Sequence, residues 1–175
     1  MKVFVSWSGS LSHSVAEAFA GWLPTVIQEC REPFVSSDIA KGEAWFQAIT
    51  VELNDARVGI AFITADNSES PWLHFESGAM LTQLSKQRIC PVVIDLKKSD
   101  YKGPLTNLQL TDISDAQDFY KLLATVNSVC DNPLSEPVLR DTFDMRWPTL
   151  KSLVERARET SSKAAVAPKI HPDWV

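Results

Sequence analysis

The chain has 175 residues, 45% of them hydrophobic, which is enough to build one domain with a full-sized core. Its net charge of −5 argues against broad electrostatic binding to nucleic acid or to an anionic membrane, because either partner requires a basic face. No apolar run approaches the roughly 20 residues that span a bilayer, and residues 1–7 lack the pattern of a signal peptide, so neither a nucleic-acid nor a membrane partner is expected.

The N-terminal part of the chain alternates between strand-like and helix-like segments. Residues 3–5 form an apolar run that predicts a strand, and residues 6–10 form a turn of small residues. A helix is expected next, with Ser12 or Ser14 capping its start, because apolar residues recur at spacings of three and four. Those residues are Val15, Phe19, Trp22, Leu23 and Val26.

A short second strand is predicted over residues 33–36, followed by a polar loop over residues 37–42. A second amphipathic helix follows, with apolar residues four apart. They are Trp45, Ile49 and Leu53. Residues 58–63 are almost wholly apolar, interrupted by Gly59 alone. A strand buried on both faces has this composition, which favours a parallel sheet covered by helices on each side.

The third helix has the clearest start in the chain. Ser70 is a capping residue and Pro71 suits the first helical position, and the helix is expected to run to about residue 87. Residues 89–96 predict another apolar strand, and residues 108–113 predict a weaker last one. A further helix carries an apolar stripe formed by Phe119, Leu122, Leu123 and Val126.

The C-terminal segment exceeds this alternation of strands and helices. Two more helices are indicated, the second opened by Pro148. Their apolar residues are Val138, Leu139 and Phe143, then Leu150, Leu153, Val154 and Ala157. We therefore expect residues 1–130 to form the main domain, residues 131–160 a helical extension packed on it, and residues 161–175 a tail or linker.

Five strands alternating with helices predict an α/β fold of flavodoxin-like topology. The expected sheet is parallel, has the order 2-1-3-4-5 and carries helices on both faces, with the extra C-terminal helices added. Ligands of such sheets bind beyond the carboxyl ends of the strands, at the switch point between the first and third strands. Residues 6–10 and 64–70 flank that point here, and the helix that starts at Pro71 leads away from it.

The cysteines are three in number, widely spaced, and form no CxxC pair. They are Cys30, Cys90 and Cys130. An odd and scattered set indicates buried thiols in a reducing compartment rather than a disulfide framework or a zinc site. We therefore expect a cytoplasmic protein without a metal centre.

Several other chemistries lack their sequence signals. The GxGxxG and GxxxxGK[ST] phosphate-binding patterns and the GxSxG nucleophile pattern are absent. A phosphorelay receiver would need acidic residues where this chain has Ser6 and Thr64. His13 and His171 have no acidic or cysteine partner close in sequence, and His74 is expected to be exposed rather than catalytic.

Trp72 and Glu76 lie four apart in the first two turns of the third helix, so their side chains share a face near the switch point. An aromatic plane can stack on a nicotinamide ring or a nucleobase, and a carboxylate one turn later can stabilise or attack a cationic ribose carbon. The structural alternative is a solvated Glu76 and a core Trp72. Phe75, Ala79 and Met80 surround Glu76 with apolar groups, which favours a functional carboxylate.

Three segments in the correct order make the chain resemble bacterial TIR (Toll/interleukin-1 receptor) domains. Residues 4–8 are similar to the first strand of that family and the loop after it, and residues 34–42 are similar to its second strand and BB loop. Residues 71–76 carry its WxxxE pattern, with Glu76 in the catalytic position. The likeness covers about residues 1–130.

The resemblance implies a hydrolase that cleaves NAD+, as substrate and without a further cofactor, to nicotinamide and a linear, cyclic or transferred ADP-ribose product. It implies substrate contacts from Trp7, Ser8, Ala40, Lys41, Trp45 and Trp72, with a core role equally open for Trp45. It also implies self-association through TIR–TIR contacts, an effector or partner protein, and a nucleotide signal or NAD+ depletion in anti-phage defence.

One departure from the family concerns the segment after the first strand. Many members carry a basic residue there, where this chain has Ser8 and Gly9. Phosphate contacts must then come from backbone N–H groups, hydroxyls or Lys41. Two alternatives to the enzyme stay open, a TIR adaptor without activity and a nucleoside deoxyribosyltransferase-like enzyme.

Overall fold

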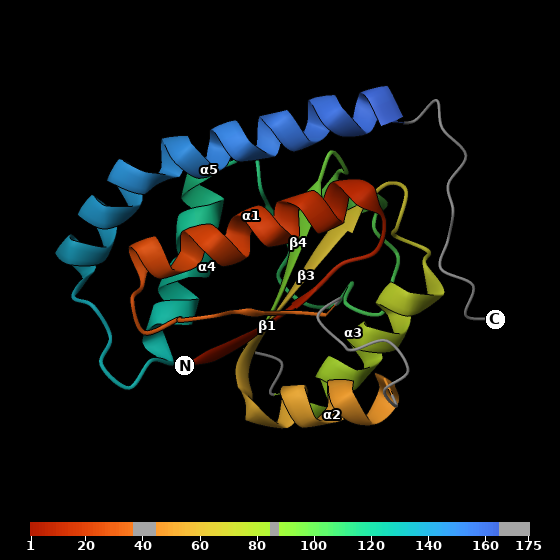
Figure 1. Ribbon diagram of the computed structural model, residues 1–175, viewed down its shortest axis with the longest axis horizontal. Coiled ribbons are helices and arrows are strands. Elements are labelled where there is room, and N and C mark those ends of the chain that lie inside the picture. Colours follow the sequence, from red (N-terminus) through yellow and green to blue (C-terminus); the bar gives the residue numbers. More distant parts are fainter. Residues whose placement is uncertain (37–44, 85–87, 165–175) are drawn as a thin grey trace.

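A computed structural model describes residues 1–36, 45–84 and 88–164, and within them strands and helices alternate along the chain (Figure 1). The five strands are β1 (Lys2–Ser6), β2 (Phe34–Val35), β3 (Ala56–Thr64), β4 (Ile89–Ile94) and β5 (Thr111–Asp112). The helices are α1 (Ser10–Val26), α2 (Trp45–Asp55), α3 (Pro71–Gln83), α4 (Ala116–Ser128) and α5 (Glu136–Ala164), and residues Lys98–Asp100 form the 3-10 turn η2.

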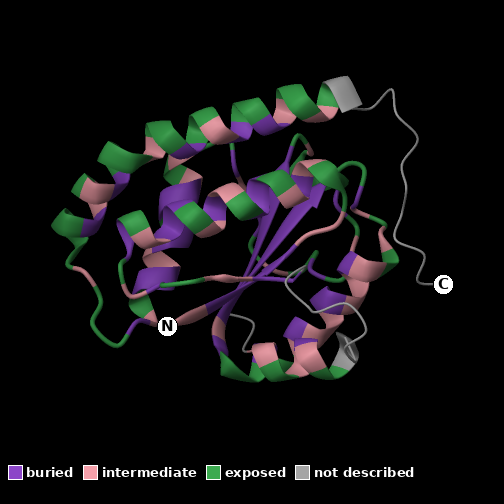
Figure 2. Ribbon diagram, in the orientation of Figure 1, coloured by how far each residue is buried: buried purple, intermediate pink, exposed green. Residues whose placement is uncertain are grey.

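The strands form one parallel sheet in the order β2-β1-β3-β4-β5. This is the α/β, flavodoxin-like topology predicted from the sequence. Because β1 lies between β2 and β3, the winding reverses beside it, and the switch point falls at its carboxyl end. Strands β3 and β4 are buried almost throughout, which explains their continuous apolar sequences (Figure 2).

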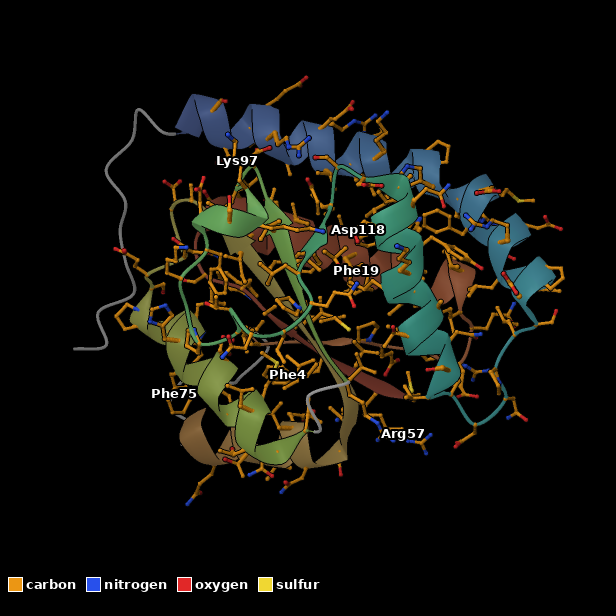
Figure 3. All side chains as sticks on the ribbon, turned by 180° about the vertical axis from the view of Figure 1, so that it is seen from behind. Phe4, Phe19, Arg57, Phe75, Lys97 and Asp118 are labelled. Atoms are coloured by element: carbon orange, nitrogen blue, oxygen red, sulfur yellow. The ribbon has the colours of Figure 1, made fainter. Side chains whose placement is uncertain are left out.

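Helices cover both faces of the sheet. Figure 1 shows α1, α4 and α5 on one side and α2 and α3 on the other. Alternate residues of β1 supply the two cores, with Val3 and Val5 on the α1 side and Phe4 on the α3 side. Figure 3 marks Phe4 together with Phe19, which belongs to the core on the α1 side. The apolar stripe predicted for α1 is buried in that same core.

Two predicted helix boundaries differ from the structure. Helix α1 begins at Ser10, with Gly9 as its N-cap at φ 91°, so neither Ser12 nor Ser14 caps it. The Ser12 hydroxyl is instead buried against the preceding turn, where it donates to the carbonyl of Ser8 at 2.6 Å. Helix α3 ends at Gln83 rather than near residue 87, because Leu84 adopts an extended conformation.

The prediction of two C-terminal helices is wrong, because α5 is one continuous helix with Pro148 inside it. Proline lacks an N–H and normally ends a helix. Here apolar residues on both sides of Pro148 pack into the same core, which holds the helix together across the missing hydrogen bond. They are Leu139, Phe143, Leu150, Val154 and Ala157. Within the described residues, no helix is both long enough and apolar enough to cross a membrane.

Helix α5 is fastened to the rest of the domain at two levels. Near its middle, the indole N–H of Trp22 in α1 donates to the carbonyl of Arg146 at 2.8 Å. Near its C-terminal end, the guanidinium of Arg158 contacts the Asp95 carboxylate at 2.9 Å and the Ser114 hydroxyl at 2.9 Å. Asp95 follows β4 and Ser114 follows β5, so α5 ends over the carboxyl edge of the sheet.

Gly59 explains the one break in the apolar sequence of β3. A Cβ atom there would collide with Met80 and lie 3.0 Å from Cδ1 of Leu84, so α3 approaches the sheet closely at this point. We expect Gly59→Ala to lower the free energy of unfolding by about 1–3 kcal/mol through overpacking. In Gly78→Ala, where a Cβ meets nothing within 4 Å, the same change gains helix propensity of up to about 1 kcal/mol. Urea denaturation measures both, and equal stabilities would contradict this account.

Candidate active site

Glu76 is buried in the second turn of α3, with 0% of its surface exposed. The Ser6 hydroxyl, at the carboxyl end of β1, donates a hydrogen bond to its Oε2 atom. The carboxyl group therefore points into the domain at the switch point, where the topology predicts a ligand site, and not into water. The structural alternative of a solvated Glu76 is excluded.

The loop before α3 is attached to the loop after β1 by side-chain hydrogen bonds. Asn67 is buried, and its amide donates to the carbonyl oxygens of Ser8 at 2.9 Å and Phe62 at 3.0 Å. Ser70 is the N-cap of α3, but its hydroxyl bonds the Ser8 hydroxyl at 2.8 Å instead of capping the helix. Pro71 then fixes the first helical φ angle. Together these contacts fix where α3 starts and hence where Glu76 lies.

The environment of Glu76 disfavours its charge. Burial raises the pKa of the Glu76 carboxyl to about 8, and the hydroxyls of Ser6 and Ser36 lower it only in part. The Oε1 atom is buried and accepts no hydrogen bond from the described residues. Native proteins rarely leave a buried carboxyl so poorly paired, and such groups are concentrated at functional sites.

Two further buried polar atoms have no hydrogen-bond partner in the described part of the chain, Ser36 Oγ and Trp7 Nε1. Ser36 follows β2, and its hydroxyl lowers the pKa of the Glu76 carboxyl. The hydroxyl does not reach hydrogen-bond geometry with it. Trp7 follows β1 but packs against the core on the opposite face, where it stacks on His13 of α1 with 4.1 Å between ring centroids. These two atoms and Glu76 Oε1 therefore all belong to segments at or beside the carboxyl end of β1.

The structure brings some of the predicted site residues together and separates others. Ser8 lies beside the start of α3, through the contact of its hydroxyl with that of Ser70. Trp72 is half-buried against the core on the α3 side and stacks on Phe75, with 6.0 Å between ring centroids (Phe75 is marked in Figure 3). Trp7 faces away from Glu76, towards α1. Its expected contact with the substrate would require a ligand that extends around the end of β1.

Three of the predicted contacts lie partly or wholly beyond what the structure describes. Ala40 and Lys41 fall outside the described residues. Trp45 begins α2, but its side chain is not described. Their roles stay predictions.

Sequence reasoning missed the roles of Ser6, Ser36 and Asn67. A signal existed for the two serines, because each directly follows the apolar residues of a strand at its carboxyl end. The expectation that His13 has no acidic partner was wrong. Its Nε2 lies 2.9 Å from the carboxylate of Glu17, one helical turn later.

Other side chains offer weaker candidates for chemistry. All three cysteines are buried, as predicted. Burial raises the pKa of the Cys30 and Cys90 thiols to about 12, so neither is a ready nucleophile. His74 donates from Nε2 to the carbonyl of Ser68 at 2.7 Å. Within the described ranges, no cluster of His, Cys, Asp and Glu could hold a metal ion. A groove of about 300 Å³ lies between α1 and α5, across the sheet from Glu76.

Comparison with known proteins agrees with this arrangement. The family model described as TIR domain matches residues 3–124, well over half of the chain, and includes β1 from its second residue, the other four strands and the residues around Glu76. No curated protein gave a match. The match ends within α4, so α5 is an addition to the matched region. On this match and on the observed sheet order, the chain belongs to the TIR domain family.

Proposed function

We propose that this chain is a cytoplasmic NAD+ glycohydrolase or ADP-ribosyl cyclase whose catalytic residue is Glu76. One observation supports this above the others, the buried and incompletely paired carboxyl group at the switch point of the sheet. An adaptor that acts only through its surface has no use for such a group, which is costly to bury.

The proposed reaction breaks the bond between C1′ of the ribose and the nicotinamide nitrogen. The bonding electrons go to that nitrogen, which neutralises the pyridinium ring, so nicotinamide leaves without a proton from an acid catalyst. The Glu76 carboxylate stabilises the positive charge that develops at C1′, or attacks it. Water, which releases a proton to solvent, or a nucleophilic atom elsewhere on the substrate then bonds to C1′ and gives a linear or cyclic product. Where Glu76 has attacked, its bond to C1′ breaks in this step and the carboxylate is regenerated.

In this scheme the positive charge of the substrate offsets the free-energy cost of ionising the buried Glu76 carboxyl. The carboxyl must lose its proton before it can act, and its raised pKa opposes that step at neutral pH. The pyridinium ring of NAD+ carries a positive charge, and a positive charge a few ångströms away favours the ionised carboxylate. Binding of the correct substrate therefore activates the group that cleaves it.

The remaining contacts are proposed from family membership. Ser8 and Trp72 line the nicotinamide and ribose side of the site, with Trp7 and Trp45 at its borders. Ala40 and Lys41 approach from the segment after β2, where Lys41 supplies the positive charge for the phosphates. Self-association through TIR–TIR contacts completes the site. In anti-phage defence, either the product acts as a nucleotide signal or the reaction depletes NAD+.

Incubation of the purified full chain with NAD+, with products identified by mass spectrometry, tests the proposal. We expect nicotinamide to appear together with ADP-ribose or a cyclic isomer, at a rate that rises with protein concentration or crowding. NAD+ left intact under all of these conditions would contradict the proposal. Complex formation with a partner would then favour the adaptor, and base exchange on deoxynucleosides would favour the deoxyribosyltransferase.

A further inference from the structure

Ser6 and Ser36 occupy matching positions at the carboxyl ends of neighbouring strands. In the parallel register Phe4 faces Phe34 and Val5 faces Val35, and the Ser36 N–H donates to the Val5 carbonyl at 3.0 Å. The next residues in register are therefore the two serines. Their side chains point to the α3 side of the sheet, as do those of Phe4 and Phe34 two residues earlier. Both serines are buried, with Ser36 2% exposed.

These two hydroxyls face the two oxygens of one carboxyl group unequally. Ser6 donates to Oε2 of Glu76. Ser36 Oγ and Glu76 Oε1 are both buried and unpaired among the described residues, although Ser36 lies near enough to lower the pKa of Glu76. A serine hydroxyl changes its direction by a rotation about one bond, which makes Ser36 the buried, unpaired donor beside the unpaired carboxyl oxygen.

No described charged side chain takes part in this arrangement. The helices and strands with the most extensive contacts to α3 are α2, β1 and β3. The charged side chains on them, and on α3 itself, are Lys2, Glu52, Asp55, Arg57 and His74. Lys2 pairs with Glu52, and Arg57 pairs with Asp131 at the amino-terminal end of β3, far from the carboxyl edge of the sheet (Figure 3). The pKa of Glu76 responds to burial and to the two hydroxyls, and to none of these charges.

We propose that Ser6 and Ser36 act as a two-hydroxyl clamp that positions Glu76 and governs when it ionises. Ser6 holds Oε2 in both protonation states. When the carboxyl proton leaves for solvent, Ser36 turns and donates to Oε1, so that each oxygen of the carboxylate has one donor. The two serines are positioning residues that act through Glu76. The catalytic part of this inference rests on the proposed function, whereas the titration of the carboxyl does not.

The clamp is tested by titrating the Glu76 carboxyl in the full chain without substrate. Its carboxylic-acid absorption is followed by infrared difference spectroscopy and assigned by its loss in Glu76→Gln. Loss of a hydrogen bond to a charged group corresponds to a shift of about one pH unit. We therefore expect Ser36→Ala to raise the midpoint by about one unit. Ser6→Ala should raise it by less, because Ser6 donates in both protonation states, and Ser36→Thr, which keeps the hydroxyl, should keep the wild-type midpoint.

Ser77→Ala is the matched control. Ser77 is as deeply buried and is the neighbour of Glu76, but its hydroxyl donates to the carbonyl of Leu73 at 2.7 Å. Its loss should leave the midpoint unchanged. A midpoint in Ser36→Ala equal to that of the wild type would overturn the role of Ser36. If Ser36→Ala fails to fold, Ser36→Cys, with its weaker donor, should give a smaller rise and serves the same purpose.

The pH profile of nicotinamide release gives the catalytic readout. The acidic limb of kcat/KM should move to higher pH in Ser36→Ala by the same amount as the infrared midpoint, because both report ionisation of Glu76 in the free protein. A wild-type chain that leaves NAD+ intact would refute the proposed function, while the infrared titration would still decide the clamp. A profile that stays in place while the midpoint moves would refute the catalytic use of the clamp alone.

Discussion

Glu76→Gln is expected to lower the rate of nicotinamide release from NAD+ by about 10³-fold or more, with the fold intact. Glutamine has nearly the same shape but carries no charge, so it can neither stabilise a cationic C1′ nor attack it. Because Oε1 of Glu76 is unpaired and Oε2 accepts from Ser6, an amide fits the same space. Initial rates by chromatography of nicotinamide, beside circular dichroism of the variant, measure the effect.

Glu69→Gln provides the matched control for this variant. Glu69 lies in the loop just before α3, seven residues earlier, and is exposed to solvent. The same change of charge there should leave the rate within about two-fold of the wild type, since surface charges away from the reacting atoms contribute little. A Glu76→Gln protein that releases nicotinamide as fast as Glu69→Gln would remove Glu76 from the reaction.

Stability should fall as the pH rises from 5 to 8, and Glu76→Gln should abolish most of that slope. The carboxyl has a folded-state pKa of about 8 against an ordinary value of 4.5. Between these values the folded chain holds a proton that the unfolded chain has released. The free energy of unfolding therefore decreases with pH, at up to about 1.4 kcal/mol per unit for this group. The variant is expected to be the more stable protein at pH 8.

Urea denaturation at pH 5, 6.5 and 8 measures this effect for the wild type, Glu76→Gln and Glu69→Gln. Other groups titrate in the same range, but they are common to all three proteins, so the difference between slopes isolates residue 76. We expect Glu69→Gln to keep the wild-type slope. Equal slopes for all three proteins would show that the Glu76 carboxyl is ionised in the folded state at neutral pH.

The topology and the position of Glu76 could be predicted because both depend on short-range patterns. Apolar residues on both faces of β3 indicate a parallel sheet. The sequence Ser70-Pro71 identifies Pro71 as the first residue of α3. Glu76 then falls at the switch point by helix geometry alone. Residue type and spacing are enough to predict a feature when the contacts that determine it lie within one helix or strand.

The features that the sequence alone could not predict depend on contacts between elements. Pro148 indicates a helix start in isolation, and only packing against α1 and α4 shows that α5 continues through it. Trp7 follows β1, but the pleat of that strand sends its ring to the face opposite Glu76. The pairing of Ser6 with Ser36 requires the register of β1 with β2, and the two-residue β2 carries no local signal for that register.

The anchoring of Arg158 to Asp95 and Ser114 has a practical consequence for how this protein is handled. Because Arg158 holds the last turns of α5 over the carboxyl edge of the sheet, a fluorophore attached to those turns lies at the same edge of the sheet as Ser6 and its partner Glu76. The amino group of Met1 lies at the other edge, bonded to the carbonyl of Glu29 at 2.6 Å (Figure 1). Immobilisation through the N-terminus therefore leaves the carboxyl edge of the sheet clear, at the loss of one hydrogen bond.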